Sequence, residues 1–161
     1  MIKLHGAPER FEVVADFVYS RFGKSIKYIA DVAGGQGMLT RILNKKYNYQ
    51  AEVVDPRGWT LKGVPSRQEE FNNKIADYYD LIIGLHPDEA TRAVVESALV
   101  KPVLIIPCCN FWDKSKKLGR EAMLAEFIKY FDEHDIKWER VVFSFSSSKN
   151  IGLVSAPKGV K

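Results

Sequence analysis

A glycine-rich loop between a strand pattern and a helix pattern constrains this chain more than any other feature. A run of apolar and β-branched residues that begins at Tyr28 ends in Asp31 and predicts a strand, and the apolar spacing after Gly37 predicts a helix. Glycine occupies 34, 35 and 37, and it permits positive φ and lets a ligand lie against bare backbone. The free N–H groups at the start of the following helix carry partial positive charge. We therefore expect a ligand cradle.

The glycine spacing indicates which ligand is disfavoured. A dinucleotide fingerprint has the form Gly-x-Gly-x-x-Gly, and counting from Gly35 places Thr40 where its third glycine would be. A bound pyrophosphate, and with it a nicotinamide enzyme, is therefore poorly supported. The spacing of Asp31, Ala33, Gly35 and Gly37 suits a different ligand.

Asp55 is the second marked position. It lies 20 residues after Gly35, at the tip of the next predicted strand, where a carboxylate can accept hydrogen bonds from ribose hydroxyls. The alternative is that residues 55–58, Asp-Pro-Arg-Gly, form a simple turn. The glycine loop before it favours ribose binding.

The rest of the chain alternates strand and helix patterns. The spacing predicts helices over 8–22, 38–47, 68–79, 88–99 and 121–133, and strands over 28–31, 50–54, 59–64, 80–85, 102–107, 137–145 and 150–156. The last two strands are close enough in sequence to form a hairpin, which requires an antiparallel strand. The expected fold class is α/β, a three-layer Rossmann-like fold with a mostly parallel sheet of about seven strands and a C-terminal antiparallel hairpin. We expect one domain over 1–161.

Composition restricts the setting of the protein. No apolar run approaches the roughly 18 residues that a membrane span needs, and the N-terminus has no signal-peptide core. The two cysteines are adjacent, at 108 and 109, which favours a reducing cytoplasm and gives no metal site. A net charge of +4 and a pI near 9.0 are compatible with a polyanionic partner.

In open parallel sheets, ligands bind beyond the carboxyl ends of the strands. Four predicted loops meet there: the glycine loop, Asp55, the turn at 84–88 and the turn at 108–112. One pocket can therefore use every marked loop.

With these features the chain resembles the class I S-adenosylmethionine-dependent methyltransferases along nearly its whole length. Residues 31–37, Asp-Val-Ala-Gly-Gly-Gln-Gly, carry the resemblance together with Asp55 and the terminal hairpin, and Ala33 replaces a frequent glycine. The resemblance implies that S-adenosyl-L-methionine is the cofactor, that Gly35 and Gly37 line its methionine moiety, and that Asp31 holds its ammonium group. The implied cofactor-binding residues are Asp31, Ala33, Gly34, Gly35, Gly37, Asp55, Gln68, Gly84 and Leu85, with residues 66–68 beside the adenine.

The acceptor side resembles a narrower group of methyltransferases. Residues 84–88, Gly-Leu-His-Pro-Asp, and 107–110, Pro-Cys-Cys-Asn, are similar to the group with Gly-Leu-His and Pro-Cys-Cys motifs, which includes a transfer-RNA ribose methyltransferase. The resemblance implies an enzyme class and not a substrate. The candidate catalytic residues are His86, Asp88, Cys109 and Asn110.

Each of these candidates has a structural alternative. His86 can serve as a general base or can close the pocket by a hydrogen bond to a neighbouring loop. Asp88 can orient His86 or an acceptor, although the start of a predicted helix favours an N-cap. Cys108 and Cys109 can offer a thiolate nucleophile, but buried packing is the commoner fate of such cysteines.

A basic segment follows the cysteines. Phe111 and Trp112 can stack a nucleobase or belong to the core, and the cations at 114, 116, 117 and 120 can bind phosphates or form a solvated loop. We expect a cytoplasmic S-adenosylmethionine-dependent methyltransferase with RNA somewhat favoured over a small molecule as acceptor. The possible RNA contacts are Lys114, Lys116, Lys117 and Arg120. The alternative is a non-catalytic adapter that keeps the fold while a partner protein supplies recognition.

Overall fold

The fold is built on one seven-stranded sheet with the order β3-β2-β1-β4-β5-β7-β6. The structure is a computed structural model, and it describes residues 8–159. The strands are β1 (Tyr28–Val32), β2 (Gln50–Val54), β3 (Ser66–Arg67), β4 (Leu81–Leu85), β5 (Val103–Ile106), β6 (Lys137–Val142) and β7 (Ile151–Ala156). Five strands run parallel, β7 is antiparallel to β5, and β6 pairs with β7 as a hairpin. The predicted fold class is confirmed.

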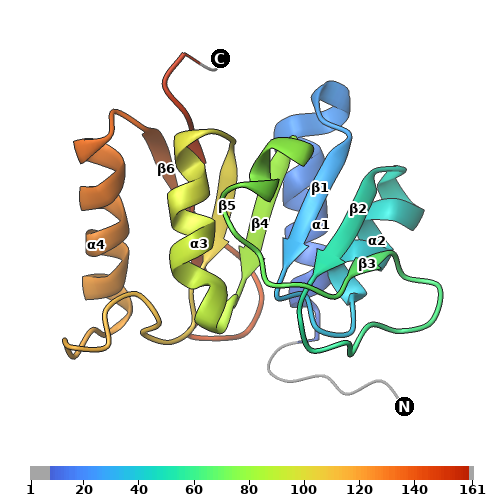
Figure 1. The fold of residues 1–161 in the computed structure, drawn as a ribbon, viewed down its shortest axis with the longest axis horizontal. Coiled ribbons are helices and arrows are strands. Elements are labelled where there is room, and N and C mark those ends of the chain that lie inside the picture. The colour runs from blue at the N-terminus through green and yellow to red at the C-terminus, as the bar shows by residue number, and fades with distance from the viewer. Residues whose placement is uncertain (1–7, 160–161) are drawn as a thin grey trace.

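Helices cover both faces of the sheet (Figure 1). On one face, α1 (Arg10–Phe22) and α2 (Met38–Tyr47) bury apolar residues such as Val14 and Leu43 against the strands. On the other, α3 (Thr91–Glu96) and α4 (Arg120–Glu133) bury residues such as Phe127. Strand residues alternate between the two cores because successive side chains point to opposite faces. This three-layer packing holds the strand ends, and therefore the loops after them, in place.

The segment between β2 and β4 differs from the prediction. The expected strand at 59–64 is absent and the two-residue β3 lies just after it, while the expected helix at 68–79 is reduced to the 3-10 turn η2 (Ile75–Tyr78). Residues 65–70 are all exposed, and the chain after them buries Phe71, Ala76 and Tyr79 in one core without an α-helix. In this segment the apolar spacing predicted the wrong secondary structure.

The expected helix at 88–99 forms three short pieces. They are η3 (Asp88–Ala90), α3 and η4 (Ser97–Leu99). Asp88 has φ 50°, which a continuous right-handed helix cannot contain. A further 3-10 turn, η1 (Gly23–Ser25), follows α1.

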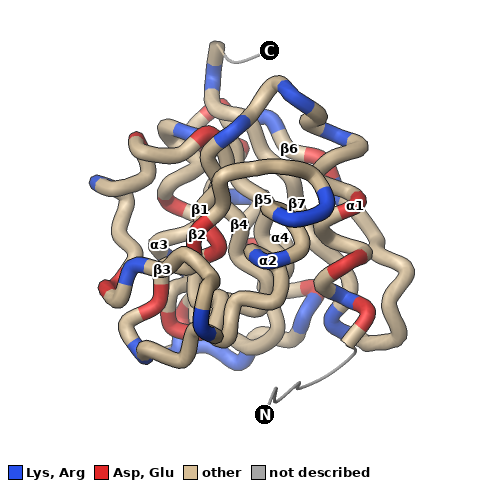
Figure 2. Tube along the Cα trace, turned by 90° about the vertical axis from the view of Figure 1, so that its right-hand side faces the viewer, with Lys and Arg blue, Asp and Glu red and all other residues tan. Residues whose placement is uncertain are grey.

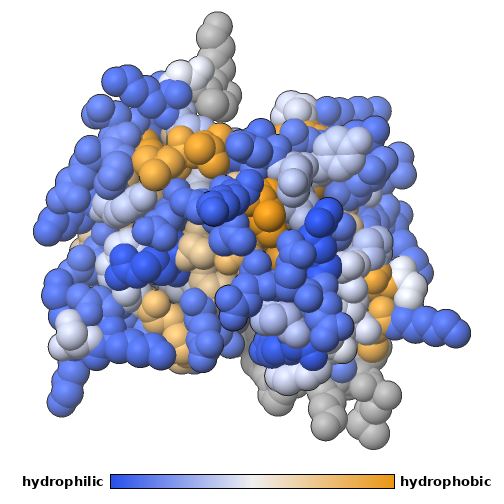
Figure 3. Space-filling view, in the orientation of Figure 1, coloured by the Kyte–Doolittle hydropathy of each residue, from blue (hydrophilic) through white to orange (hydrophobic). Residues whose placement is uncertain are grey.

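The described surface carries mixed charge. Basic and acidic positions are interspersed along the chain in Figure 2, and the face in Figure 3 is largely hydrophilic with apolar groups near one end of α3. Leu99 and Val100, which follow α3, are indeed exposed. The net positive charge is thus dispersed over this part of the chain.

No helix within residues 8–159 is long and apolar enough to cross a membrane.

Candidate functional site

Five loops surround the carboxyl ends of the parallel strands, at the lower edge of the sheet in Figure 1. Four are the predicted ones, after β1, β2, β4 and β5. The fifth is the 143–150 loop of the β6–β7 hairpin, which sequence reasoning missed. It reaches the site because His86 Nε2 lies 2.9 Å from the carbonyl oxygen of Lys149. A serine-rich connection followed by lysine was its sole sequence signal.

The glycine loop is a tight turn with several residues in the left-handed region. Ala33, Gly35 and Gly37 have φ values of 55°, 60° and 87°. Positive φ suits glycine but strains Ala33, whose amide is held by the Val54 carbonyl at 2.8 Å. A Cβ at Gly37 would lie 2.6 Å from Val64 Cγ1. The loop therefore requires glycine at 37 for both conformation and space.

Asp31 lies directly under this loop. Its side chain accepts hydrogen bonds from the Thr40 hydroxyl at 2.9 Å and the Thr40 amide at 3.3 Å, and the residue is 2% exposed. Burial raises the pKa of Asp31 to about 7, even though the Thr40 hydrogen bonds act to lower it. Asp31 thus anchors the start of α2, and its contact with an ammonium group stays a prediction.

Asp55 joins the second strand to the glycine loop. Its Oδ2 accepts a hydrogen bond from the Gly35 amide at 3.0 Å, and the residue is 3% exposed. Burial by itself would raise the pKa of Asp55, but hydrogen bonds from Arg57 and Gly35 bring it below the ordinary value. The ion pair with Arg57, at 2.6 Å, was not predicted. The hydrogen bond from the Arg57 amide to Asp55 Oδ1, at 2.9 Å, agrees with the expected Asp-Pro-Arg-Gly turn, and ribose binding by Asp55 stays a prediction.

His86 follows β4 with φ 52°, an uncommon conformation for a histidine. A carbonyl oxygen only accepts hydrogen bonds, so His86 Nε2 carries the proton in the contact with Lys149. Burial lowers the pKa of His86, while the bond to Lys149 acts in the opposite direction. The ring is therefore neutral at pH 7 with a lone pair on Nδ1. The predicted hydrogen bond to a neighbouring loop is present.

Asp88 is not an N-cap, contrary to the favoured alternative. No capping hydrogen bond forms from its side chain; instead, Oδ1 accepts a hydrogen bond from the Cys108 thiol at 3.2 Å. The left-handed conformation at 88 turns the chain before α3 and points the carboxylate at the loop after β5. Burial, followed by the contact with Asp88, raises the pKa of Cys108 to about 12. This thiol is consequently not a thiolate nucleophile.

Cys109 is exposed, so the expectation of buried packing is wrong for this residue. Its sulfur lies 3.8 Å from Lys149 Nζ. His86, Cys109 and Lys149 therefore come together from three loops at the acceptor side. Within residues 8–159, no group of three or more metal-ligating side chains is present.

Asn110 shapes the loop after β5. Its amide nitrogen donates to the carbonyl oxygens of Asp113 and Lys116, and its oxygen accepts from the amides of Trp112 and Asp113. These bonds use the whole capacity of the amide group. A catalytic role for Asn110 stays a prediction that the present loop conformation does not favour.

Trp112 belongs to the core rather than to a base-stacking surface. It is 9% exposed, and its ring packs edge-on against Phe127 at 5.4 Å and Tyr130 at 5.8 Å. Phe111 is half-buried and lies under the ammonium group of Lys114. Trp112 could stack on a nucleobase only if the core opened. Of the two aromatic residues, only Phe111 is therefore available for stacking.

The basic segment is partly neutralised. Lys116 pairs with Glu126 at 3.1 Å, and Arg120 lies 3.7 Å from Glu121 while donating a hydrogen bond to the Ser148 carbonyl. Lys117 is exposed. The segment is therefore a mixed-charge loop beside the site.

Three other predicted cofactor residues lie in different surroundings. Gln68 is exposed, and its amide group would lie within about 3 Å of a Cβ at Gly58. Gly84 is enclosed by Pro87, Ile105 and Val94, and Leu85 is buried in one of the two cores. Gly84 and Leu85 thus position the turn at His86 from inside the strand.

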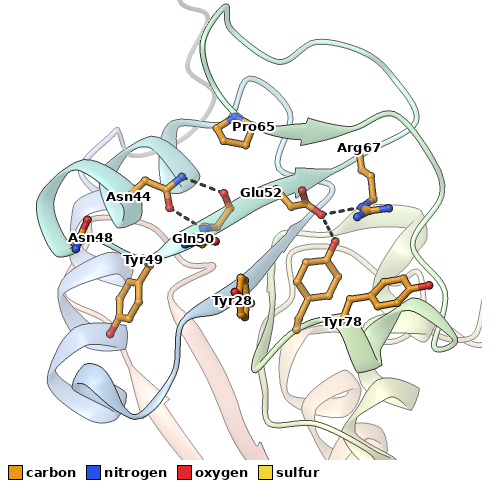
Figure 4. Close-up of a pocket in the computed structure, with 11 residues that line it drawn as sticks. Tyr28, Asn44, Asn48, Tyr49, Gln50, Glu52, Pro65, Arg67 and Tyr78 are labelled. Atoms are coloured by element: carbon orange, nitrogen blue, oxygen red, sulfur yellow. Dashed lines mark hydrogen bonds and ion pairs between the residues drawn. The ribbon is translucent and has the colours of Figure 1, made fainter.

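A separate pocket of about 570 Å³ lies beside the starts of β1 and β2, away from the glycine loop (Figure 4). Its lining includes exposed Tyr28 and Tyr78 and the side chain of Glu52, which accepts hydrogen bonds from Arg67 at 2.8 Å and Tyr79 at 2.5 Å. The polar groups of this cluster bond one another. Of the residues predicted to hold the cofactor or to lie beside its adenine, only Arg67 is among those that line this pocket.

No protein-family model matches the sequence, and no curated protein matches it. Similar solved structures include a candidate S-adenosyl-L-methionine-dependent methyltransferase from Methanococcus maripaludis, at 15% identity over 94% of this chain and 86% of that one, with a TM-score of 0.64. The plantazolicin methyltransferase BpumL, in complex with a substrate analogue and S-adenosylhomocysteine, is 11% identical over 94% and 86%, with a TM-score of 0.60. A candidate hemolysin from Streptococcus thermophilus is 10% identical over 98% of this chain and 70% of that one, with a TM-score of 0.61. The chain therefore has the fold of the S-adenosylmethionine-dependent methyltransferase structures.

Proposed function

We propose that this protein is an S-adenosylmethionine-dependent methyltransferase. The observation that carries the proposal is the 3.0 Å hydrogen bond from the Gly35 amide to Asp55, which brings the glycine loop and the strand-tip carboxylate together. The surroundings fit a nucleoside cofactor, because a Cβ at Gly35 would meet nothing nearer than the movable Arg57 side chain at 4.0 Å. The fold shared with methyltransferase structures supports the same conclusion.

In this proposal the backbone of residues 33–37 and the Asp55 carboxylate hold the cofactor. The cofactor would supply a methyl group on a sulfonium centre. His86 then acts as the general base: its Nε2–H is fixed by the Lys149 carbonyl, which leaves Nδ1 to take a proton from the acceptor. Burial and the hydrogen bond to Asp88 keep Cys108 in its protonated form, so this cysteine does not compete as a nucleophile.

RNA is the acceptor that we favour over a small molecule. The support is the basic composition together with the exposed Lys114 and Lys117, which follow half-buried Phe111 beside the site. Cations next to an aromatic ring suit a nucleotide, since the ring can stack a base while the cations meet phosphates. The pairing of Lys116 with Glu126 limits this surface to a few contacts.

A calorimetric titration with S-adenosylhomocysteine tests the cofactor. We expect saturable binding by the wild-type protein and at least a tenfold loss in Asp55→Ala, since the carboxylate receives a donor from the glycine loop. Asp77→Ala removes an exposed aspartate of η2 and serves as the matched control. An absence of binding heat at high protein concentration would refute the proposal.

The acceptor requires a different experiment. The protein is incubated with methyl-labelled cofactor and either total RNA or a metabolite extract. We expect label in the RNA fraction, and less of it with Lys114→Ala combined with Lys117→Ala. Label confined to the small-molecule fraction would exclude RNA as the acceptor.

A non-catalytic role is the second candidate, and one observation favours it. The polar groups at the site already bond one another: His86 is hydrogen-bonded to the Lys149 carbonyl, and Asp55 forms an ion pair with Arg57. In that case a partner protein recognises the substrate. Cofactor binding that is unaffected by His86→Ala, with no methyl transfer to any extract, would support this role.

A further inference from the structure

Arg57 encloses the Asp55 carboxylate. Arg57 Nε donates to Oδ1 at 2.9 Å and Oδ2 at 3.1 Å, and Nη2 donates to Oδ2 at 2.6 Å. The Arg57 backbone amide adds a hydrogen bond to Oδ1 at 2.9 Å. With the Gly35 amide also bound, both carboxylate oxygens are occupied by donors. Asp55 has no acceptor position left for an incoming hydroxyl group.

The same guanidinium also contacts the glycine loop and an aromatic ring. Arg57 Nη2 donates to the Ala33 carbonyl at 3.3 Å, so the side chain crosses from the β2 loop to the glycine loop. Its outer face lies 4.2 Å from the centre of the Trp59 ring, which is 59% exposed. The guanidinium therefore lies between the cradle and an aromatic ring on the solvent side.

These contacts occupy the place where the vicinal hydroxyls of a ribose would bind. The Arg57 side chain is 36% exposed whereas Asp55 is 2% exposed, so arginine lies on the solvent side of the carboxylate. A ribose can reach Asp55 only if the guanidinium leaves. Since Asp55 would keep its bonds to two backbone amides, the exchange does not leave a buried carboxylate without partners.

We propose that Arg57 is an internal competitor for the ribose subsite, which must swing off Asp55 before the nucleoside part of the ligand binds. This inference rests on the proposed function. It makes Arg57 a determinant of cofactor affinity, because each binding event includes the cost of breaking the Arg57–Asp55 pair. Trp59 holds the guanidinium in the competing position.

The test compares the affinity of wild type, Arg57→Ala and Arg57→Gln for S-adenosylhomocysteine by calorimetry. We expect both variants to bind about fivefold more tightly, the effect of removing one partly exposed ion pair. Lys62→Ala, which removes an exposed cation from the same loop, should match wild type. Arg57→Gln keeps the side-chain length and provides a second measurement if the alanine variant unfolds.

A double-mutant comparison isolates the competition. In an Asp55→Asn background the guanidinium loses its charged anchor, so adding Arg57→Gln should no longer improve binding. A readout without turnover is the NMR signal of the Arg57 Nε–H group, which should be protected from exchange in the free protein and lose that protection when S-adenosylhomocysteine is added. Unchanged or weaker binding by both variants, with wild type still binding, would overturn the inference alone. Absence of binding by every variant would overturn the proposed function and the inference with it.

Discussion

His86 Nε2 lies 2.9 Å from the carbonyl oxygen of Lys149, although 63 positions separate the two residues in the chain. The contact closes the β6–β7 loop over the end of β4. It also fixes the tautomer of His86, since the carbonyl requires a donor. The loop is held at a second point, where Glu9 accepts hydrogen bonds from the Ser146 amide and hydroxyl at 3.0 and 2.8 Å.

Methyl transfer is expected to depend on pH through His86. Burial lowers the pKa of His86 below its usual 6.5, so the base is neutral and active above that range. The rate should therefore rise as pH increases through a pKa below 6.5 and be level at pH 7. The measurement is a pH profile of single-turnover transfer by wild type and His86→Asn. A profile of the same shape in the variant would exclude His86 as the base.

Asp31 should make the protein less stable as pH rises. Its pKa is raised from 3.8 to about 7, so the folded state binds more protons than the unfolded state between these values. The stabilisation is complete below pH 3.8 and is lost as pH increases through about 7. The measurement is the unfolding free energy of the wild-type protein and of Asp31→Asn at pH 5 and at pH 8. We expect the difference between the two proteins to change by about 2–4 kcal/mol between these pH values. Asp77→Asn is the control. If the unfolding free energy of Asp31→Asn depended on pH as strongly as that of the wild-type protein, the prediction would be contradicted.

Gly34→Ala should destabilise the fold because there is no room for the added methyl group. An added Cβ would lie 2.6 Å from Asp31 Cγ, a buried group with no freedom to withdraw. The expected loss is about 1–3 kcal/mol in urea unfolding. Gly119→Ala is the matched control, since nothing lies within 4 Å of its added Cβ and its φ is −77°. Equal effects of the two substitutions would show that the Asp31 carboxylate does not restrict residue 34.

The two adjacent cysteines should differ in reactivity. Cys109 is exposed, whereas burial and Asp88 raise the pKa of Cys108 to about 12 and keep it a thiol at pH 8. Brief treatment with iodoacetamide should therefore add one group to wild type and none to Cys109→Ser. Intact-protein mass spectrometry distinguishes these outcomes. Modification of Cys108 at a comparable rate would show that its contact with Asp88 is not maintained in solution.

The parts of the fold that follow local patterns were predictable. Short apolar runs such as 81–85 and 103–106 form buried strands, and the apolar stripe after Gly37 forms α2. The glycine loop and Asp55 are likewise adjacent because consecutive parallel strands end at the same edge. Prediction was wrong at 59–64 and 68–79, where residues 65–70 are exposed and Phe71, Ala76 and Tyr79 are buried without an α-helix.

The sequence by itself determined most of the strands and helices and the glycine loop between β1 and α2, because hydrophobic period and glycine content act within a few residues of one another. Only the tertiary structure decided what each site residue contacts. Arg57 lies on Asp55, Asp88 accepts a hydrogen bond from Cys108 instead of capping a helix, and Trp112 is in the core. These outcomes depend on which distant loops meet at one edge of the sheet and on how much water their packing excludes, and neither quantity is encoded in local spacing.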